Sequence, residues 1–92
     1  MPAQRATPAR FTFAEVCCGI GGFRLALEAL GGRCVFASEY CRAAQAVYRA
    51  NFPGDDAALL AGDIRRISPA QIPPHDVLVA GFPCQDLSNQ KV

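Results

Sequence analysis

Residues 11–23, FTFAEVCCGIGGF, decide the fold of this chain. Residues 11–17 are rich in aromatic and β-branched side chains and predict a β-strand. Residues 18–22, CGIGG, predict a tight glycine-rich turn, and residues 23–30 predict a short helix. A strand that turns through glycines into a helix is the opening unit of an α/β sheet.

Beyond this unit the alternation of strand and helix continues. Further elements are predicted as strands at residues 34–37, 59–61 and 77–80, a helix at residues 42–51, and a brief helical turn from Ser68 and Pro69. The two helices carry apolar residues at helical spacing, namely Phe23, Leu27 and Leu30 in the first and Ala43, Val47 and Ala50 in the second. We therefore expect the α/β class, with a partial Rossmann-like parallel sheet of about four strands and flanking helices.

The length of 92 residues sets one domain as the upper limit. Residues 1–10 are polar and rich in Pro, Ala and Arg, and predict a disordered leader. Residues 11–92 are predicted to form a portion of one domain, because the pattern stops soon after its last strand.

Composition excludes several classes of protein. The net charge of +1 gives this segment no large basic patch for gripping phosphates. The five cysteines lack zinc-binding spacing, so we expect no metal site. Without a secretory signal or an apolar run long enough to cross a bilayer, we expect no membrane partner and a reducing cytoplasmic location. Four cysteines are predicted to pack as small core side chains: Cys17, Cys18, Cys34 and Cys41.

The glycine-rich turn is the first candidate binding site. Glycines let a ligand approach the backbone, and the N–H groups at the start of the next helix attract it. The pattern is not the dinucleotide-binding fingerprint, since Arg24 stands where its third glycine would be. The alternative is a β–α turn that holds no ligand, and the turn alone leaves both interpretations open.

Two acidic residues follow later strands. Glu39 lies 17 residues past Gly22, where a carboxylate can accept hydrogen bonds from a ribose diol. Asp63 can accept from an exocyclic amino group such as that of adenine, with Ile64 packing on the ring. The alternatives are an exposed or N-capping acid for Glu39 and a simple Gly-Asp turn for Asp63.

Cys84 is the candidate nucleophile. It follows the strand at residues 77–80 and precedes a polar loop, where a thiolate can reach a substrate. His75 lies in a Pro-rich loop, so a Cys-His protease is disfavoured. Because the carboxyl ends of parallel strands meet at one edge, all four groups are expected to converge on one crevice.

Taken in order, these segments resemble the cytosine-C5 DNA methyltransferases. Residues 15–23 resemble the family's first motif, which typically reads Asp-Leu-Phe-x-Gly-x-Gly-Gly. Residues 37–39 resemble the second motif, residues 62–64 the third, and residues 81–85, Gly-Phe-Pro-Cys-Gln, with Ser88 the fourth. The resemblance covers about residues 12–88, and the Gly-Phe-Pro-Cys-Gln run is its most specific part.

The resemblance implies S-adenosylmethionine as cofactor and duplex DNA as substrate. The residues it would place against the cofactor are Cys17, Gly19, Ile20, Gly21, Gly22, Glu39, Tyr40, Asp63, Ile64 and Pro83. Glu39 would hold the ribose hydroxyls, and Tyr40 would lie near the adenine. Cys84 would attack C6 of a cytosine flipped out of the duplex, and Gln85 and Ser88 would touch the DNA near that base.

The chain also departs from the family pattern. Cys17 stands where the family usually has Phe, which we expect to weaken packing against the cofactor, and Glu15 replaces the usual Asp. The family's Glu-Asn-Val and Gln-Arg-Arg motifs and its target-recognition region are absent from these residues. We therefore expect a complementing C-terminal polypeptide, and little or no activity from this chain alone.

Two other functions stay open at this point. An RNA cytosine-C5 methyltransferase of the same architecture would use the same residues, because nothing in the sequence separates DNA from RNA. A non-catalytic remnant or subunit that binds S-adenosylmethionine or a partner chain belongs to a different class. Cys17 favours it, whereas the intact Gly-Phe-Pro-Cys-Gln run argues against it.

Overall fold

The computed structural model describes residues 8–81 as one α/β unit. Its parallel sheet has the order β3-β2-β1-β4 and consists of β1 (Phe11–Val16), β2 (Gly32–Ser38), β3 (Leu60–Ala61) and β4 (Val77–Ala80). The helices are α2 (Gly22–Ala29), α3 (Arg42–Asn51) and the short 3-10 helices η1 (Ile64–Arg66) and η2 (Pro69–Gln71). The predicted fold class is confirmed, and most predicted elements differ by a residue or two at their ends.

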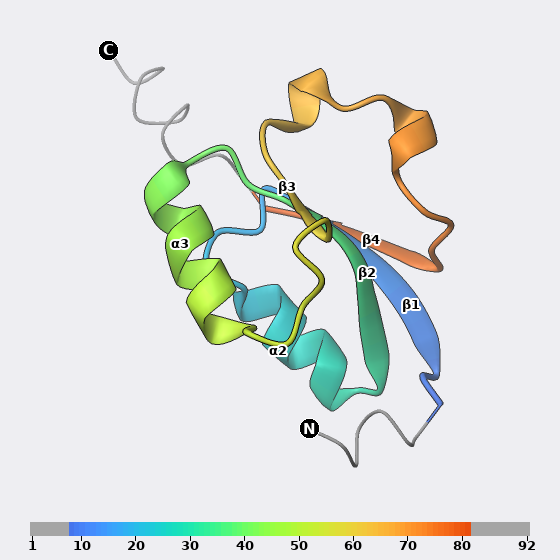
Figure 1. The fold of residues 1–92 in the computed structure, drawn as a ribbon. Coiled ribbons are helices and arrows are strands. Elements are labelled where there is room, and N and C mark those ends of the chain that lie inside the picture. The colour runs from blue at the N-terminus through green and yellow to red at the C-terminus, as the bar shows by residue number, and fades with distance from the viewer. Residues whose placement is uncertain (1–7, 82–92) are drawn as a thin grey trace.

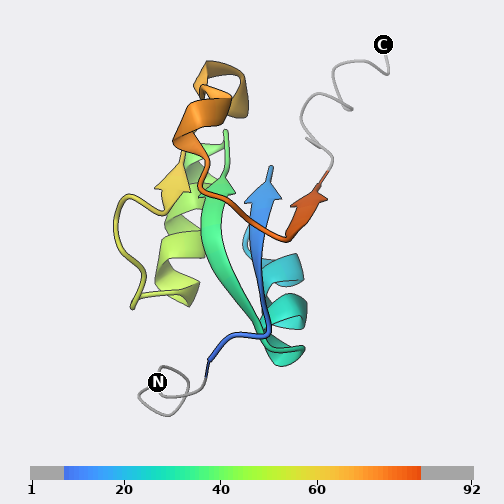
Figure 2. The same cartoon turned by 90° about the vertical axis from the view of Figure 1, so that its right-hand side faces the viewer.

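The helices α2 and α3 lie on the same face of the sheet (Figure 1). In Figure 2 the strands point the same way, and η1 and η2 lie beyond their carboxyl ends. Within residues 8–81 no α-helix covers the opposite face, and Leu78 of the edge strand β4 is 59% exposed. None of the described helices is long and apolar enough to cross a membrane.

The order of the strands reverses between β1 and β4. Strands β1, β2 and β3 follow one another outward, and the chain then returns to place β4 on the other side of β1. The Gly81 N–H, just past β4, donates to the Val16 carbonyl at the end of β1 over 2.9 Å. Open α/β sheets bind ligands at such a reversal, outside the carboxyl ends of the strands.

The buried side of α2 does not follow its apolar spacing. Phe23 and Leu30, which share a face with Leu27 by helical spacing, are 54% and 65% exposed, and the buried residue of the helix is Arg24. Only Leu27 of the predicted set packs against the core. Hydrophobic periodicity misses this orientation because buried polar partners hold the guanidinium inside.

The same correction applies to α3, where the predicted apolar stripe of Ala43, Val47 and Ala50 is exposed. The buried residue is Tyr48, with no exposed surface, and its ring packs against Phe52 with centroids 4.9 Å apart. A tyrosine that combines a large apolar ring with a satisfied hydroxyl contributes more to the core than three small side chains.

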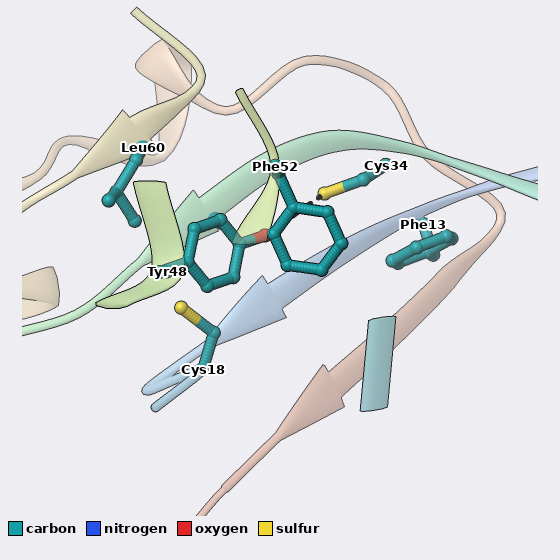
Figure 3. Close-up of a cluster of buried hydrophobic side chains, with 7 residues drawn as sticks. Phe13, Cys18, Cys34, Tyr48, Phe52 and Leu60 are labelled. Atoms are coloured by element: carbon teal, nitrogen blue, oxygen red, sulfur yellow. Dashed lines mark hydrogen bonds between the residues drawn. The ribbon is translucent and has the colours of Figure 1, made fainter. Parts of the chain in front are cut away.

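The core lies between the sheet and the two helices (Figure 3), with Phe13 of β1 fully buried within it. Two thiols, Cys18 and Cys34, are buried there as predicted, and burial raises the pKa of Cys34 to about 11. Cys17 and Cys41 are only partly buried, so the prediction that they are core residues is wrong. Both lie at strand-end loops, where the backbone and not the core sets their position.

Candidate functional site

The turn between β1 and α2 requires left-handed backbone at several residues. Cys17, Gly19 and Gly21 have φ angles of 57°, 60° and 101°. Glycine adopts such angles without a steric cost, whereas a residue with a Cβ gives up about 1–2 kcal/mol. The glycines therefore allow the turn, and Cys17 is the one position where it is strained.

The end of β2 holds one side of this turn. The Cys18 N–H donates to the Ser38 carbonyl over 2.9 Å, and the Gly19 N–H donates to Glu39 Oε1 over 2.7 Å. The second oxygen, Oε2, accepts from the Cys41 N–H at the start of α3 over 2.8 Å. The Glu39 carboxylate thus connects the glycine turn to α3, while each oxygen keeps further acceptor capacity.

The end of α3 supports the turn from beneath. A Cβ built on Gly21 would overlap the Phe52 ring and lie 3.3 Å from the Tyr48 ring. Figure 3 shows these two rings beside Cys18, which leads into the turn. In addition, the Asn51 amide donates to the Ile20 carbonyl over 3.0 Å.

The other side of the turn is open. A Cβ built on Gly19 or Gly22 would meet nothing within 4 Å among the described residues. The side chain of Ile20, between them, is 56% exposed. The turn is therefore packed on one side and accessible on the other, which is the shape needed to place backbone against a ligand.

A buried cation fixes the start of α2 against α3. The Arg24 guanidinium binds both carboxylate oxygens of Asp55 at 2.6 Å, donates to the Tyr48 hydroxyl at 3.1 Å, and lies 3.9 Å from the Phe52 ring centroid. It also donates to Glu28 one turn along the helix. Burial by itself lowers the pKa of Arg24, but the hydrogen bonds to Asp55, Tyr48 and Glu28 outweigh it, so the net pKa is raised.

Glu15 of β1 is a third acidic residue of this cluster, beside Asp55 and Glu28. It is 1% exposed and accepts a hydrogen bond from the Tyr48 hydroxyl on Oε2 over 2.9 Å. Its other oxygen, Oε1, has no partner among the described residues. Burial raises the pKa of Glu15, and the Tyr48 hydrogen bond and the charge of Arg24 oppose that rise. Glu15, which replaces the Asp usual in the family's first motif, thus belongs to a buried hydrogen-bond network beneath the glycine turn.

The third candidate group follows β3. Asp63 caps η1 by accepting from the Arg65 N–H over 3.0 Å, and the Arg65 guanidinium donates to both of its carboxylate oxygens. The hydrogen bonds from Arg65 hold the pKa of Asp63 below its usual range. Ile64 is half-buried, and Tyr40, in the loop after β2, is 58% exposed. The side chain of Asp63 is thus ionised and held in place by Arg65.

The structure brings the predicted groups after β1, β2 and β3 to one edge of the sheet (Figure 2). The segment after β4 joins them at Gly81, where a Cβ would come 2.7 Å from the Cys17 carbonyl oxygen. The remaining predicted site residues lie outside the described residues: Pro83, Cys84, Gln85 and Ser88. Within residues 8–81, no cluster of His, Cys, Asp or Glu could hold a metal ion.

Sequence reasoning missed three residues that shape this site: Arg24, Asn51 and Arg65. Arg24 was noticed only as a missing glycine, because arginine in a helix is usually exposed and its partners Tyr48 and Asp55 lie 24 and 31 residues away in the chain. Asn51 ends a helix and Arg65 follows a predicted turn, and both positions commonly hold solvated side chains. No sequence signal distinguishes these two residues, because their partners lie on other elements.

The sequence that forms this arrangement matches a known protein family. A family profile described as C-5 cytosine-specific DNA methylase matches residues 11–91. The chain belongs to that family. It is 51% identical over 79 residues to the type II methyltransferase M.HgiBI of Herpetosiphon aurantiacus, covering 86% of this chain and 18% of the relative. It is 47% identical over 76 residues to the type II methyltransferase M.HhaI of Haemophilus parahaemolyticus, covering 83% of this chain and 22% of that protein.

A third relative, the type II methyltransferase M.HaeII of Haemophilus aegyptius, is 53% identical over 70 residues, covering 76% of this chain and 21% of that protein. The chain thus spans about a fifth of the length of the curated relatives that it matches. The residues that the family profile matches include the glycine turn and the strand ends described above.

Proposed function

We propose that this chain is the cofactor-binding and nucleophile-bearing portion of a DNA cytosine-C5 methyltransferase. One observation carries the proposal: the family match over residues 11–91 falls on a sheet whose strand order reverses between the glycine turn and the Gly-Phe-Pro-Cys-Gln segment. A ligand at that reversal lies beside the glycine turn and the carboxyl end of β4. The type II names of the relatives further support a role in restriction–modification, in the cytoplasm.

The residues present fit S-adenosylmethionine. Gly19 and Gly22 leave room for a ligand on the open side of the turn, and Glu39 keeps acceptor capacity for ribose hydroxyls beside it. Exposed Tyr40 offers a ring face for the adenine, and Asp63 offers an ionised acceptor for its amino group. Ile20, Gly21 and Ile64, with Cys17 and Pro83, complete the proposed cofactor contacts.

The proposed chemistry starts at Cys84. Its thiolate adds to C6 of a flipped cytosine, which moves electron density onto C5. S-adenosylmethionine, when bound, would supply the methyl group that C5 takes up, with S-adenosylhomocysteine as the other product. A base then removes the C5 proton, and β-elimination breaks the bond between the sulfur and C6 to free the thiolate. Gln85 and Ser88 would contact the DNA near the flipped base.

Protonation of cytosine N3 requires an acid, and the family's Glu-Asn-Val motif that would provide it is absent from the 92 residues. Loss of such acid–base help costs about 10²- to 10⁴-fold in rate. We therefore propose that a complementing C-terminal polypeptide supplies this acid and the target-recognition region. Within residues 8–81, β4 is an exposed edge strand with no neighbour on its outer side, and such an edge readily accepts further chain, which supports this proposal.

The decisive experiment is covalent trapping on duplex DNA that contains 5-fluorocytosine, with S-adenosylmethionine and the complementing region of a relative added. The fluorine cannot leave as a proton does, so the adduct at Cys84 should persist through denaturing electrophoresis. Cys84→Ala should form none, and Cys34→Ala, which removes a buried thiol, is the matched control that should still trap. Adduct formation by Cys84→Ala would refute the assignment, and preferential trapping on tRNA would redirect it to RNA.

A further inference from the structure

Arg65 contacts two residues of the proposed adenine site at once. Its guanidinium lies 5.4 Å from the centroid of the Tyr40 ring. The same group donates to Asp63 through Nε at 3.0 Å and through Nη2 at 2.8 Å. Tyr40 belongs to the loop after β2 and Asp63 to the loop after β3, so one side chain connects two strand ends.

We propose that Arg65 is a positioning residue that holds the Tyr40 ring and the Asp63 carboxylate in place for the adenine ring of S-adenosylmethionine. This inference rests on the proposed function, and it adds a residue that no part of the motif comparison selects.

The geometry explains why a single arginine can do this. A guanidinium is planar, so its edge can form a fork with a carboxylate while its face lies against an aromatic ring. The Asp63 side chain is only 16% exposed and is also fixed by the Arg65 backbone N–H. Tyr40 is 58% exposed, which leaves ring surface for a ligand.

Pre-positioning matters because a side chain that must be ordered on binding weakens affinity. Without Arg65, the Tyr40 ring would be free to rotate away from the ligand. The Asp63 carboxylate would keep its hydrogen bond from the backbone N–H of residue 65 and lose the hydrogen bonds from the guanidinium. The expected consequence is weaker binding by about threefold to tenfold, the equivalent of one rotamer-rich side chain left to be ordered.

The test is calorimetric titration of the purified protein with S-adenosylhomocysteine. Arg65→Ala should raise the dissociation constant by about threefold to tenfold. Arg66→Ala removes the same charge from the adjacent exposed residue and should leave the constant unchanged. Arg65→Lys keeps the cation but not the fork, so it should restore only part of the affinity.

A double-mutant cycle separates positioning from a general structural role. In a Tyr40→Leu background, Arg65→Ala should have a smaller effect, because one of the two groups it positions is gone. The thermal unfolding midpoint should not move in the Arg65 variants, since the Arg65 side chain is 70% exposed. In the free wild-type protein, proton NMR should show a nuclear Overhauser contact between the Arg65 Cδ protons and the Tyr40 ring.

The outcomes separate this inference from the proposed function. If Arg65→Ala binds as well as or better than wild type, Arg65 either does nothing or competes with the adenine, and the inference is overturned. If the effect of Arg65→Ala is the same with and without Tyr40, it is overturned as well. If wild type does not bind the probe at all, the proposed cofactor site fails, and the role of Arg65 fails with it.

Discussion

Three alanine substitutions in the glycine turn should separate packing from ligand access. Gly19→Ala, Gly21→Ala and Gly22→Ala each add one methyl group, but the methyl enters a different environment each time. At Gly21 it overlaps the Phe52 ring, whereas at Gly19 and Gly22 it meets nothing within 4 Å. Stability and cofactor binding should therefore respond in opposite order across the series.

The effects on stability follow from the backbone angles and the space. Gly21 has φ of 101°, so alanine brings about 1–2 kcal/mol of backbone strain, and overlap with Phe52 adds about 1–3 kcal/mol. Gly19, with φ of 60°, brings the strain without the overlap, about 1 kcal/mol. Gly22 is the first residue of α2 with no positive φ, so alanine there should stabilise by about 0.5 kcal/mol.

The effects on binding should run the other way. A methyl at Gly22 or Gly19 stands on the open side of the turn, where we place the cofactor, and should weaken binding of S-adenosylhomocysteine by about tenfold or more. Gly22→Ala is the informative variant, because it should bind worse while unfolding later.

Urea denaturation followed by circular dichroism gives the free energies of unfolding, and calorimetry gives the dissociation constants. The reasoning about packing is refuted if Gly21→Ala is no less stable than Gly19→Ala. The placement of the cofactor is refuted if Gly22→Ala is folded and binds the probe like wild type.

Other predictions concern the network beneath the turn. Arg24→Leu should lower the free energy of unfolding by about 3 kcal/mol in urea titrations, because it leaves Asp55 without its fork, and Arg24→Lys should recover less than half of that. Burial raises the pKa of Glu15 in the folded protein above its ordinary value of about 4.5. The protonated form of Glu15 therefore stabilises the fold below about pH 4.5, and this contribution to the free energy of unfolding is lost as the pH rises through the folded-state pKa. The urea midpoint of Glu15→Gln, relative to that of wild type, should therefore be higher at pH 8 than at pH 4.5. The opposite trend would contradict the raised pKa. Asn51→Ala should weaken S-adenosylhomocysteine binding about twofold to fivefold while changing the melting temperature little, because it releases the Ile20 carbonyl at an exposed position. Equal affinity in calorimetry would show that the amide does not hold the turn.

The fold was predictable because it depends on local signals. Apolar runs ending in Gly, Ser-Glu or Gly-Asp mark strand ends, and alternation with helices implies a parallel sheet. The same alternation places the glycine turn, Glu39 and Asp63 at one edge without knowledge of any contact. The capping box at Ser68, where Gln71 completes η2, was likewise local and was predicted as a helical turn.

Helix orientation was not predictable from the same signals. Periodicity groups Phe23 and Leu30 on one apolar face, yet the residue of α2 that is buried is Arg24. That choice depends on Asp55 and Tyr48, which are 31 and 24 residues away in the chain. A buried cation is tolerated only where polar or acidic side chains bind it, and here those side chains lie outside the stretch of sequence that forms the helix.

The sequence by itself determined the family, the order of strands and helices, and the presence of polar groups at the strand ends, because each is written in contiguous residues. Tertiary structure alone decided which side of the glycine turn is packed and which is open, that Glu39 connects the turn to α3, and that Arg65 joins Tyr40 to Asp63. The physical reason is that these features depend on distances between atoms on different elements, which exist only after the sheet has brought the strand ends together.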